Sequence, residues 1–82
     1  MDILLSKEAA KHLKHLPKTE QLKIKRKLLI LQEDPLSGKK LSGEISGSRS
    51  LRAWPYRIVY KINLNQKSIE VTSILHRQGA YK

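Results

Sequence analysis

Three arginines dominate the part of the sequence that is best suited to chemistry. Arg49, Arg52 and Arg57 fall within a span of nine residues, and no acidic residue occurs between positions 45 and 69. Each guanidinium is a planar fork that fits a phosphate group. If the arginines lie on neighbouring strands, which run about 4.7–4.9 Å apart, their side chains converge. This pattern favours phosphate binding over an ordinary solvated strand face.

The C-terminal segment adds a second set of chemically useful groups. His76, Arg77 and Tyr81 supply an imidazole, a guanidinium and a phenol at the end of an expected strand. An imidazole can act as an acid or a base, and a phenol can donate a proton or stack on a nucleobase. A histidine near a terminus is more often incidental than catalytic. Beside arginine-bearing strands, these three side chains become candidates for an active site.

Two further histidines, His12 and His15, stand three residues apart on an expected helix. That spacing could hold a metal ion, but no third ligand follows at metal-site spacing and the neighbours are lysines. We therefore interpret the pair as surface histidines. Residues 35–82 contain only two carboxylates, Glu44 and Glu70, which are too few for a bound divalent cation. We expect neither a metal site nor a cofactor.

The segment Trp54-Pro55-Tyr56 places aromatic side chains beside the arginines. An aromatic ring at this point could stack on a nucleobase, or it could belong to the hydrophobic core. For Tyr56 the core interpretation is favoured. For Trp54 the two interpretations are equally supported.

The elements that must position these side chains follow from apolar periodicity and capping residues. Apolar residues recur at helical spacing after Ser6, whose hydroxyl can cap a helix, and again after Pro17. Beyond Gly47 the period changes from that of a helix to the alternation of a strand. We predict a strand at 3–5, helices at 7–16 and 18–34, a loop at 39–47, and strands at 48–53, 56–62 and 67–75.

Alternation along the strand at 56–62 indicates which of its side chains face the core. One face is expected to be buried and carries Tyr56, Ile58, Tyr60 and Ile62. The opposite face carries Arg57, Val59 and Lys61. The fold class is therefore α+β in the order β-α-α-β-β-β, with two N-terminal helices packed on one face of a mostly antiparallel sheet. We expect the other face to be partly open, with Arg57 and Lys61 on it.

The second expected helix carries apolar residues on two of its sides. Ile24, Leu28 and Leu31 form the main stripe, whereas Leu22 and Leu29 lie seven residues apart on roughly the opposite side. One stripe is expected to face the sheet. The other faces either the first helix or an outside partner.

The whole chain of 82 residues is expected to form one domain, 1–82, with a formal net charge of +10. The excess is uneven, because residues 1–34 have a net charge of +3 and residues 35–82 have a net charge of +7. Such a localised excess predicts a polyanionic partner, with RNA favoured. The absence of cysteine, of a long apolar run and of a secretory signal pattern indicates a cytoplasmic protein that does not bind a membrane.

Five segments form a recognisable pattern, namely Leu41-Ser42-Gly43, Ser48-Arg49-Ser50-Leu51-Arg52, Tyr56-Arg57-Ile58-Val59-Tyr60, His76-Arg77 and Tyr81. Together they resemble the RelE/ParE superfamily of toxins from prokaryotic toxin–antitoxin pairs. RelE-like members enter the ribosomal A site and cleave mRNA there, whereas ParE-like members inhibit DNA gyrase and cut no RNA. The resemblance implies a cognate antitoxin as partner in a hetero-oligomer.

The resemblance to RelE-type enzymes also implies roles for particular side chains. Arg57 would stabilise the phosphorane, Arg77 would bind the phosphate or the leaving oxygen, and Tyr81 would stack on a base or transfer a proton. Arg52 would be a supporting phosphate contact, and the cleavage would proceed without a metal by attack of the ribose 2′-oxygen. We expect a ribosome-dependent endoribonuclease, an mRNA interferase, whose partners include mRNA on the ribosome and contacts to 16S rRNA.

One departure from the RelE pattern bears on this expectation. Ser48 and Ser50 occupy the positions at which the best-known RelE sequences carry two lysines. Either Arg49 and His76 replace that charge, or cleavage is weak or missing. The alternatives are therefore a ParE-type gyrase inhibitor without nuclease activity and a plain RNA-binding module. The set that favours cleavage consists of Arg57, His76, Arg77 and Tyr81.

Overall fold

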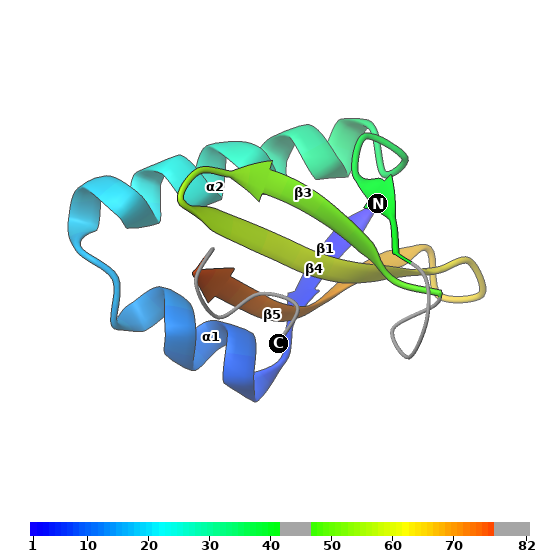
Figure 1. Cartoon of the computed structure of the whole chain (residues 1–82). Coiled ribbons are helices and arrows are strands. Elements are labelled where there is room, and N and C mark those ends of the chain that lie inside the picture. The colour runs from blue at the N-terminus through cyan, green and yellow to red at the C-terminus, as the bar shows by residue number, and fades with distance from the viewer. Residues whose placement is uncertain (42–46, 77–82) are drawn as a thin grey trace.

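A computed structural model describes residues 1–41 and 47–76 of the chain (Figure 1). Two helices cover one face of a five-stranded sheet. No helix in the described part is long and apolar enough to cross a membrane. In chain order the elements are β1 (Asp2–Leu5), α1 (Lys7–Lys14), α2 (Lys18–Glu33), β2 (Lys39–Lys40), β3 (Arg49–Ala53), β4 (Tyr56–Asn63) and β5 (Ser68–His76).

The two helices begin at the expected residues and end one or two residues earlier than expected. Ser6 caps α1 as predicted, because its Oγ accepts a hydrogen bond from the backbone N–H of Ala9 at 3.0 Å. Pro17 precedes α2, where the missing N–H of proline costs no helical hydrogen bond. Both helix starts are therefore set by residues that can be identified in the sequence.

The strands form one sheet in the order β1-β5-β4-β3-β2. β1 runs parallel to β5, and the remaining neighbours are antiparallel, which confirms the mostly antiparallel sheet. The prediction of a loop across 39–47 is wrong at its start, because Lys39 and Lys40 pair with Ser50 and Arg49 as the edge strand β2. The strand cannot be recognised in the sequence, because it consists of two lysines and lacks the apolar alternation by which strands are predicted.

An apolar cluster joins both helices to the sheet. Its fully buried members include Ile24 and Leu31 of α2, with Ile58 and Tyr60 of β4. α1 contributes Ala9. The prediction that Ile58 and Tyr60 face inward is therefore confirmed, and the sheet buries one face against α1 and α2.

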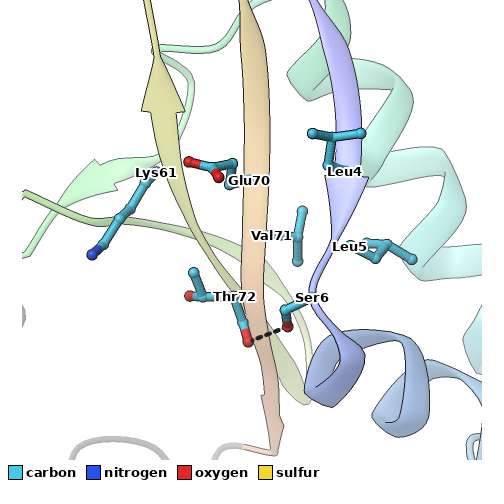
Figure 2. Close-up of a pocket in the computed structure, with 7 residues that line it drawn as sticks. All are labelled: Leu4, Leu5, Ser6, Lys61, Glu70, Val71 and Thr72. Atoms are coloured by element: carbon cyan, nitrogen blue, oxygen red, sulfur yellow. Dashed lines mark hydrogen bonds between the residues drawn. The ribbon is translucent and has the colours of Figure 1, made fainter. Parts of the chain in front are cut away.

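β5 contains a bulge that changes its alternation. Val59 pairs with Ser73 and Tyr60 pairs with Val71, so Thr72 is an extra residue on β5. The Oγ1 of Thr72 donates to the carbonyl of Val59 at 3.2 Å, and the hydroxyl of Ser6 donates to the carbonyl of Thr72 at 2.9 Å (Figure 2). The bulge is thus held by β4 on one side and by the cap of α1 on the other.

Candidate functional site

The face of the sheet opposite the helices carries a pair of arginines at the end next to the β3–β4 turn. Arg52 of β3 lies directly opposite Arg57 of β4, and directly opposite residues project on the same side of a sheet. Ser50 and Val59 form the next such pair on this side. We call this side the distal face and define it by Ser50, Arg52, Arg57, Val59 and Lys61.

Two cations directly opposite each other make the arginine pair electrostatically unfavourable by itself. Arg52 is exposed and Arg57 is half-buried. An anion held between the two guanidinium groups would offset the repulsion, and a phosphate fits the fork of each group. The arrangement therefore suits a phosphodiester better than it suits a neutral ligand.

Lys61 extends the positive charge along the distal face, as the alternation predicted. It is exposed and lies opposite Glu70 of β5. Figure 2 shows the Lys61 ammonium pointing away from the Glu70 carboxylate. Both residues line a hollow of about 300 Å³ beside β1 and the start of α1. The Lys61 charge is thus directed outward rather than into the sheet.

Two serines occupy the positions at which the resemblance to RelE predicts lysines. Ser48 and Ser50 are buried, with only 5% and 4% of their surface exposed. Side chains this small and this buried present neither charge nor reach to a bound phosphate. On the distal face the described cations therefore come from Arg52, Arg57 and Lys61.

The expectation that Arg49 converges with the other two arginines is wrong. Arg49 lies opposite Tyr60, whose side chain is in the core, so Arg49 projects on the helix side of the sheet. Its Nη1 donates a hydrogen bond to the carbonyl of Gly38 at 3.0 Å. The reason is strand alternation, because residues 49 and 52 are separated by an odd number of steps and must face opposite ways.

Tyr60 and Gly38 complete the structure that holds Arg49. The Tyr60 hydroxyl donates to the carbonyl of Pro35 at 2.7 Å and accepts from the N–H of Gly38 at 2.9 Å. Burial raises the pKa of the Tyr60 hydroxyl, while the Gly38 hydrogen bond and the positive charge of Arg49 partly oppose the increase. These contacts fasten the segment after α2 to the sheet.

His76 lies at the end of β5 but not on the distal face. It pairs with Tyr56, and their rings make an edge-to-face contact with centroids 5.4 Å apart and planes at 84°. Because of the bulge, Leu75 rather than Ile74 lies opposite Arg57, and His76 falls on the side of the sheet that carries Tyr56. The structure therefore places two predicted site residues, Arg57 and His76, at one end of the sheet but on opposite sides of it.

A hollow of about 570 Å³ between α1 and the end of the sheet brings three imidazoles together. It is lined by His12, His15, Tyr56 and His76, among other residues. His12 also approaches Glu8, with 3.9 Å between its Nε2 and a carboxylate oxygen. The sequence does not place His76 beside the pair of His12 and His15, because residues 12 and 76 meet only through the packing of α1 on β5.

The remaining predicted site residues, Arg77 and Tyr81, lie outside the described residues. Within the described part of the chain, no three His, Asp or Glu side chains form a group that could hold a metal ion. The described part of the candidate site therefore consists of the distal face and of the end of the sheet near His76.

The aromatic residues beside the arginines separate into core and surface. Tyr56 is half-buried and packs against the core cluster, so its predicted core role is confirmed. Trp54 keeps 55% of its surface exposed, which excludes a buried core position. Its carbonyl accepts a hydrogen bond from the Nζ of Lys23 at 3.0 Å, and this bond ties the β3–β4 turn to α2.

The second apolar stripe of α2 faces solvent. Leu22 and Leu29 are 55% and 62% exposed, and the adjacent Ile30 is 45% exposed. Because these side chains are exposed, the stripe does not pack against α1, which was one of its two expected positions. The stripe is available to an outside partner.

Comparisons with solved structures give toxins of toxin–antitoxin systems. The RelBE2 toxin–antitoxin complex from Mycobacterium tuberculosis is 26% identical with a TM-score of 0.85, covering 93% of this chain and 96% of that chain. The E. coli RelBE complex is 26% identical with a TM-score of 0.78, covering 92% and 94%. The YoeB-YefM complex from Staphylococcus aureus is 25% identical with a TM-score of 0.77, covering 93% and 95%. Comparison with curated proteins gave no match.

The sequence comparison with protein families agrees with the structural one. Residues 3–81 match the family described as "ParE toxin of type II toxin-antitoxin system, parDE". The match spans nearly the whole chain, including both helices, strands β2 to β5 and all of β1 except Asp2. The fold of two helices on a mostly antiparallel sheet is that of the RelE-like toxins. The chain therefore belongs to the ParE/RelE family of toxins of type II toxin–antitoxin systems.

Proposed function

We propose that this toxin is a ribosome-dependent endoribonuclease that cleaves translated mRNA. The observation that carries the proposal is the cross-strand pair of Arg52 and Arg57 on the distal face. Two guanidinium groups held opposite each other suit the negative charge that a phosphodiester accumulates as it is attacked. The similarity to the RelE and YoeB toxins supports the same assignment.

In the proposed reaction the ribose 2′-oxygen attacks the adjacent phosphorus, and the bond from phosphorus to the 5′-oxygen breaks. The proton of the 2′-hydroxyl passes to a basic group, and the departing 5′-oxygen receives a proton. The products are a 2′,3′-cyclic phosphate and a 5′-hydroxyl. Arg57 stabilises the pentacoordinate phosphorus, Arg52 and Lys61 hold the flanking backbone, and Arg77 contacts the phosphate or the leaving oxygen. No metal ion takes part.

The proton carrier is either His76 or Tyr81. His76 lies on the helix side of the sheet in the structure, so it would reach the phosphate around the end of β5 rather than across the distal face. Comparing His76→Ala with Tyr81→Phe in one ribosome cleavage assay assigns the role. The larger loss of cleavage identifies the residue that carries the proton.

Primer extension on mRNA after induction of the toxin tests the proposed function. Growth arrest accompanied by cuts within the codons of translated frames is the expected result. Arrest with intact transcripts and DNA damage would instead establish the second candidate, a gyrase inhibitor without nuclease activity. Two observations favour that candidate, namely the match to the ParE toxin family and the buried Ser48 and Ser50.

A cognate antitoxin is the second proposed partner, and it is supported by the antitoxin-bound toxins among the similar structures. Its binding surface is proposed to include the exposed stripe of Leu22 and Leu29 on α2. The surrounding helix surface carries Lys18, Lys25 and Arg26, all exposed. An antitoxin segment with apolar and acidic side chains would complement both features.

A further inference from the structure

We propose that Trp54 is a base-stacking residue beside the arginine pair, and that it binds one nucleobase of single-stranded RNA. The inference rests on the proposed function and adds a recognition element to it. None of the roles assigned above involves this side chain. Its position, exposure and attachment each contribute to the argument.

Trp54 follows directly on the strand that carries Arg52. Ala53 pairs with Tyr56, so Trp54 and Pro55 form the two-residue connection between β3 and β4. The preceding cross-strand pair is Arg52 with Arg57. The indole is therefore attached at the end of the sheet where the two guanidinium groups are, within reach of a nucleotide whose phosphate they hold.

The exposure of Trp54 contrasts with the burial of its neighbour. Ala53 is 1% exposed and belongs to the core, whereas Trp54 is 55% exposed. The larger part of the Trp54 surface therefore lies in water, where a nucleobase can reach it. Exposed aromatic rings flanked by cations are typical of surfaces that bind single-stranded nucleic acid.

The backbone that carries the indole is held in place. The Nζ of Lys23 donates to the Trp54 carbonyl at 3.0 Å and also contacts the two carboxylate oxygens of Glu20 at 3.2 and 3.4 Å. The turn is thus fixed to α2 from one side and to the sheet from the other. Because the turn is already ordered, less conformational entropy is lost when a base stacks on the ring.

The chemistry points to single-stranded RNA rather than to a duplex. In a duplex the face of each base is covered by its neighbours, so an indole at a strand turn reaches a base only where the bases are unstacked. Stacking tolerates any base, because every base has a π-face. Trp54 therefore contributes affinity and places the bound nucleotide, while the arginine pair holds its phosphate.

Fluorescence of the full chain tests the contact directly, because Trp54 is the only tryptophan. The probe is a single-stranded RNA hexanucleotide with 2′-O-methyl groups, which cannot attack the adjacent phosphate. Titration is expected to quench the indole emission, and an abasic oligonucleotide of equal charge is expected to leave it unchanged. Equal quenching by both probes, or quenching by neither, would overturn the proposal.

Variants extend the test to binding affinity. Trp54→Leu is expected to weaken hexanucleotide binding by about 5- to 150-fold, while Trp54→Phe retains most of it. Leu64→Ala is the matched control, because Leu64 is 74% exposed in the turn that follows β4 at its opposite end. It is expected to bind like the wild type. Weakening by Leu64→Ala equal to that by Trp54→Leu would show a general loss of surface hydrophobicity and would overturn the stacking role.

Primer extension in cells separates this proposal from the proposed function. If the wild-type toxin cuts mRNA and Trp54→Leu cuts less efficiently while Trp54→Phe cuts normally, stacking is supported. If Trp54→Leu cuts at the wild-type rate and positions, the stacking role is wrong and the nuclease function stands. If the wild-type toxin cuts no transcript, the nuclease function itself is wrong, and the stacking role that rests on it is withdrawn.

Discussion

Arg49 and Arg52 have the same side chain and lie three residues apart, but the sheet gives them different surroundings. Arg49 hydrogen-bonds the carbonyl of Gly38 on the helix side, whereas Arg52 lies opposite Arg57 on the distal face. The first position contributes to the structure of the segment after α2. The second is exposed on the surface, so residue type alone does not identify the site.

Removing Arg57 tests the proposed chemistry at the scale of one side chain. Arg57→Ala, and equally Arg77→Ala, is expected to lower ribosome-dependent cleavage by about 10²–10³-fold, because each removes a cation aimed at the developing charge. The free energy of unfolding of Arg57→Ala should fall by no more than about 3 kcal/mol, so that the variant stays folded. Arg77→Lys should recover only part of the activity, since a lysine is a point charge.

The matched control for this prediction is Arg49→Ala, which removes the same charge from the helix side. It should lower the melting temperature through loss of the Gly38 contact while leaving cleavage by the folded fraction near the wild-type rate. Full toxicity of both Arg57→Ala and Arg77→Ala would show that the protein acts through a binding surface instead.

Tyr60 gives a pH-dependent prediction. Its hydroxyl hydrogen-bonds Pro35 and Gly38, so Tyr60→Phe should cost about 1–3 kcal/mol of unfolding free energy near neutral pH. Burial raises the pKa of Tyr60 above its usual value of 10.0. A raised pKa means that the folded state favours the protonated phenol. The stabilisation is complete below about pH 10 and is lost as the pH rises further.

Urea unfolding of both proteins at about pH 8 and about pH 11 measures this dependence. The difference between wild type and Tyr60→Phe should shrink by up to about 1.4 kcal/mol one pH unit above the unfolded pKa. Comparing the two proteins cancels the titration of the lysines, which they share. A difference that stays constant across this range would show that the phenol titrates alike in both states.

At the scale of elements, the segment between α2 and β3 depends on close packing at Gly38. A Cβ at this position would approach the Tyr60 ring to 2.7 Å from Cε1 and 2.9 Å from Cζ. Gly38→Ala is therefore expected to destabilise the fold by about 1–3 kcal/mol, lowering the melting temperature by several degrees. Thermal unfolding followed by circular dichroism measures the change.

A double-mutant cycle with Tyr60→Phe checks the cause of that loss. The two substitutions act on one contact, so the double variant should lose less stability than the two single variants together. Additive losses would place the effect of Gly38→Ala elsewhere, for example in the backbone of the segment itself.

The sequence predicted most elements because each has a local signature. Ser6 and Pro17 mark helix starts, and the alternation of Ile58, Tyr60 and Ile62 marks a strand with one buried face. Strand β2 was missed because its Lys39 and Lys40 have no apolar pattern and pair only through tertiary structure. The position of His76 was missed because it depends on the bulge at Thr72, although the spacing of Val71 and Ile74 breaks the alternation and is its signature.

At the scale of the whole molecule, the two surfaces assigned to partners lie on different parts of the fold. The distal face belongs to the sheet, and the exposed stripe of Leu22 and Leu29 belongs to α2 on the helix-covered side. An antitoxin that binds the stripe therefore need not compete for the arginine pair unless it also extends around the edge of the sheet.

Leu22→Asp combined with Leu29→Asp tests the stripe as the antitoxin surface. The double variant should bind the antitoxin at least about tenfold more weakly, because each change places a charge in an apolar contact. Both side chains are exposed, so the melting temperature should stay close to that of the wild type. Isothermal titration calorimetry gives the affinity, and Leu64→Asp, at a leucine that is 74% exposed and lies outside the stripe, serves as the control. Unfolding of the double variant would assign the stripe to the core.

The bulge in β5 has a consequence for how the chain tolerates changes of length. With Thr72 present, Ile74 is buried in the core and Leu75 lies opposite Arg57. Because Thr72 is the one residue of this stretch without an opposite position on β4, deleting it would restore simple alternation and leave Ser73, Ile74 and His76 on the faces they now occupy. Substitutions can change this strand one side chain at a time. A one-residue deletion at the bulge likewise keeps the two faces in place, whereas a residue inserted after Ser73 would exchange them beyond that point, so family members should differ in length at the bulge rather than after it.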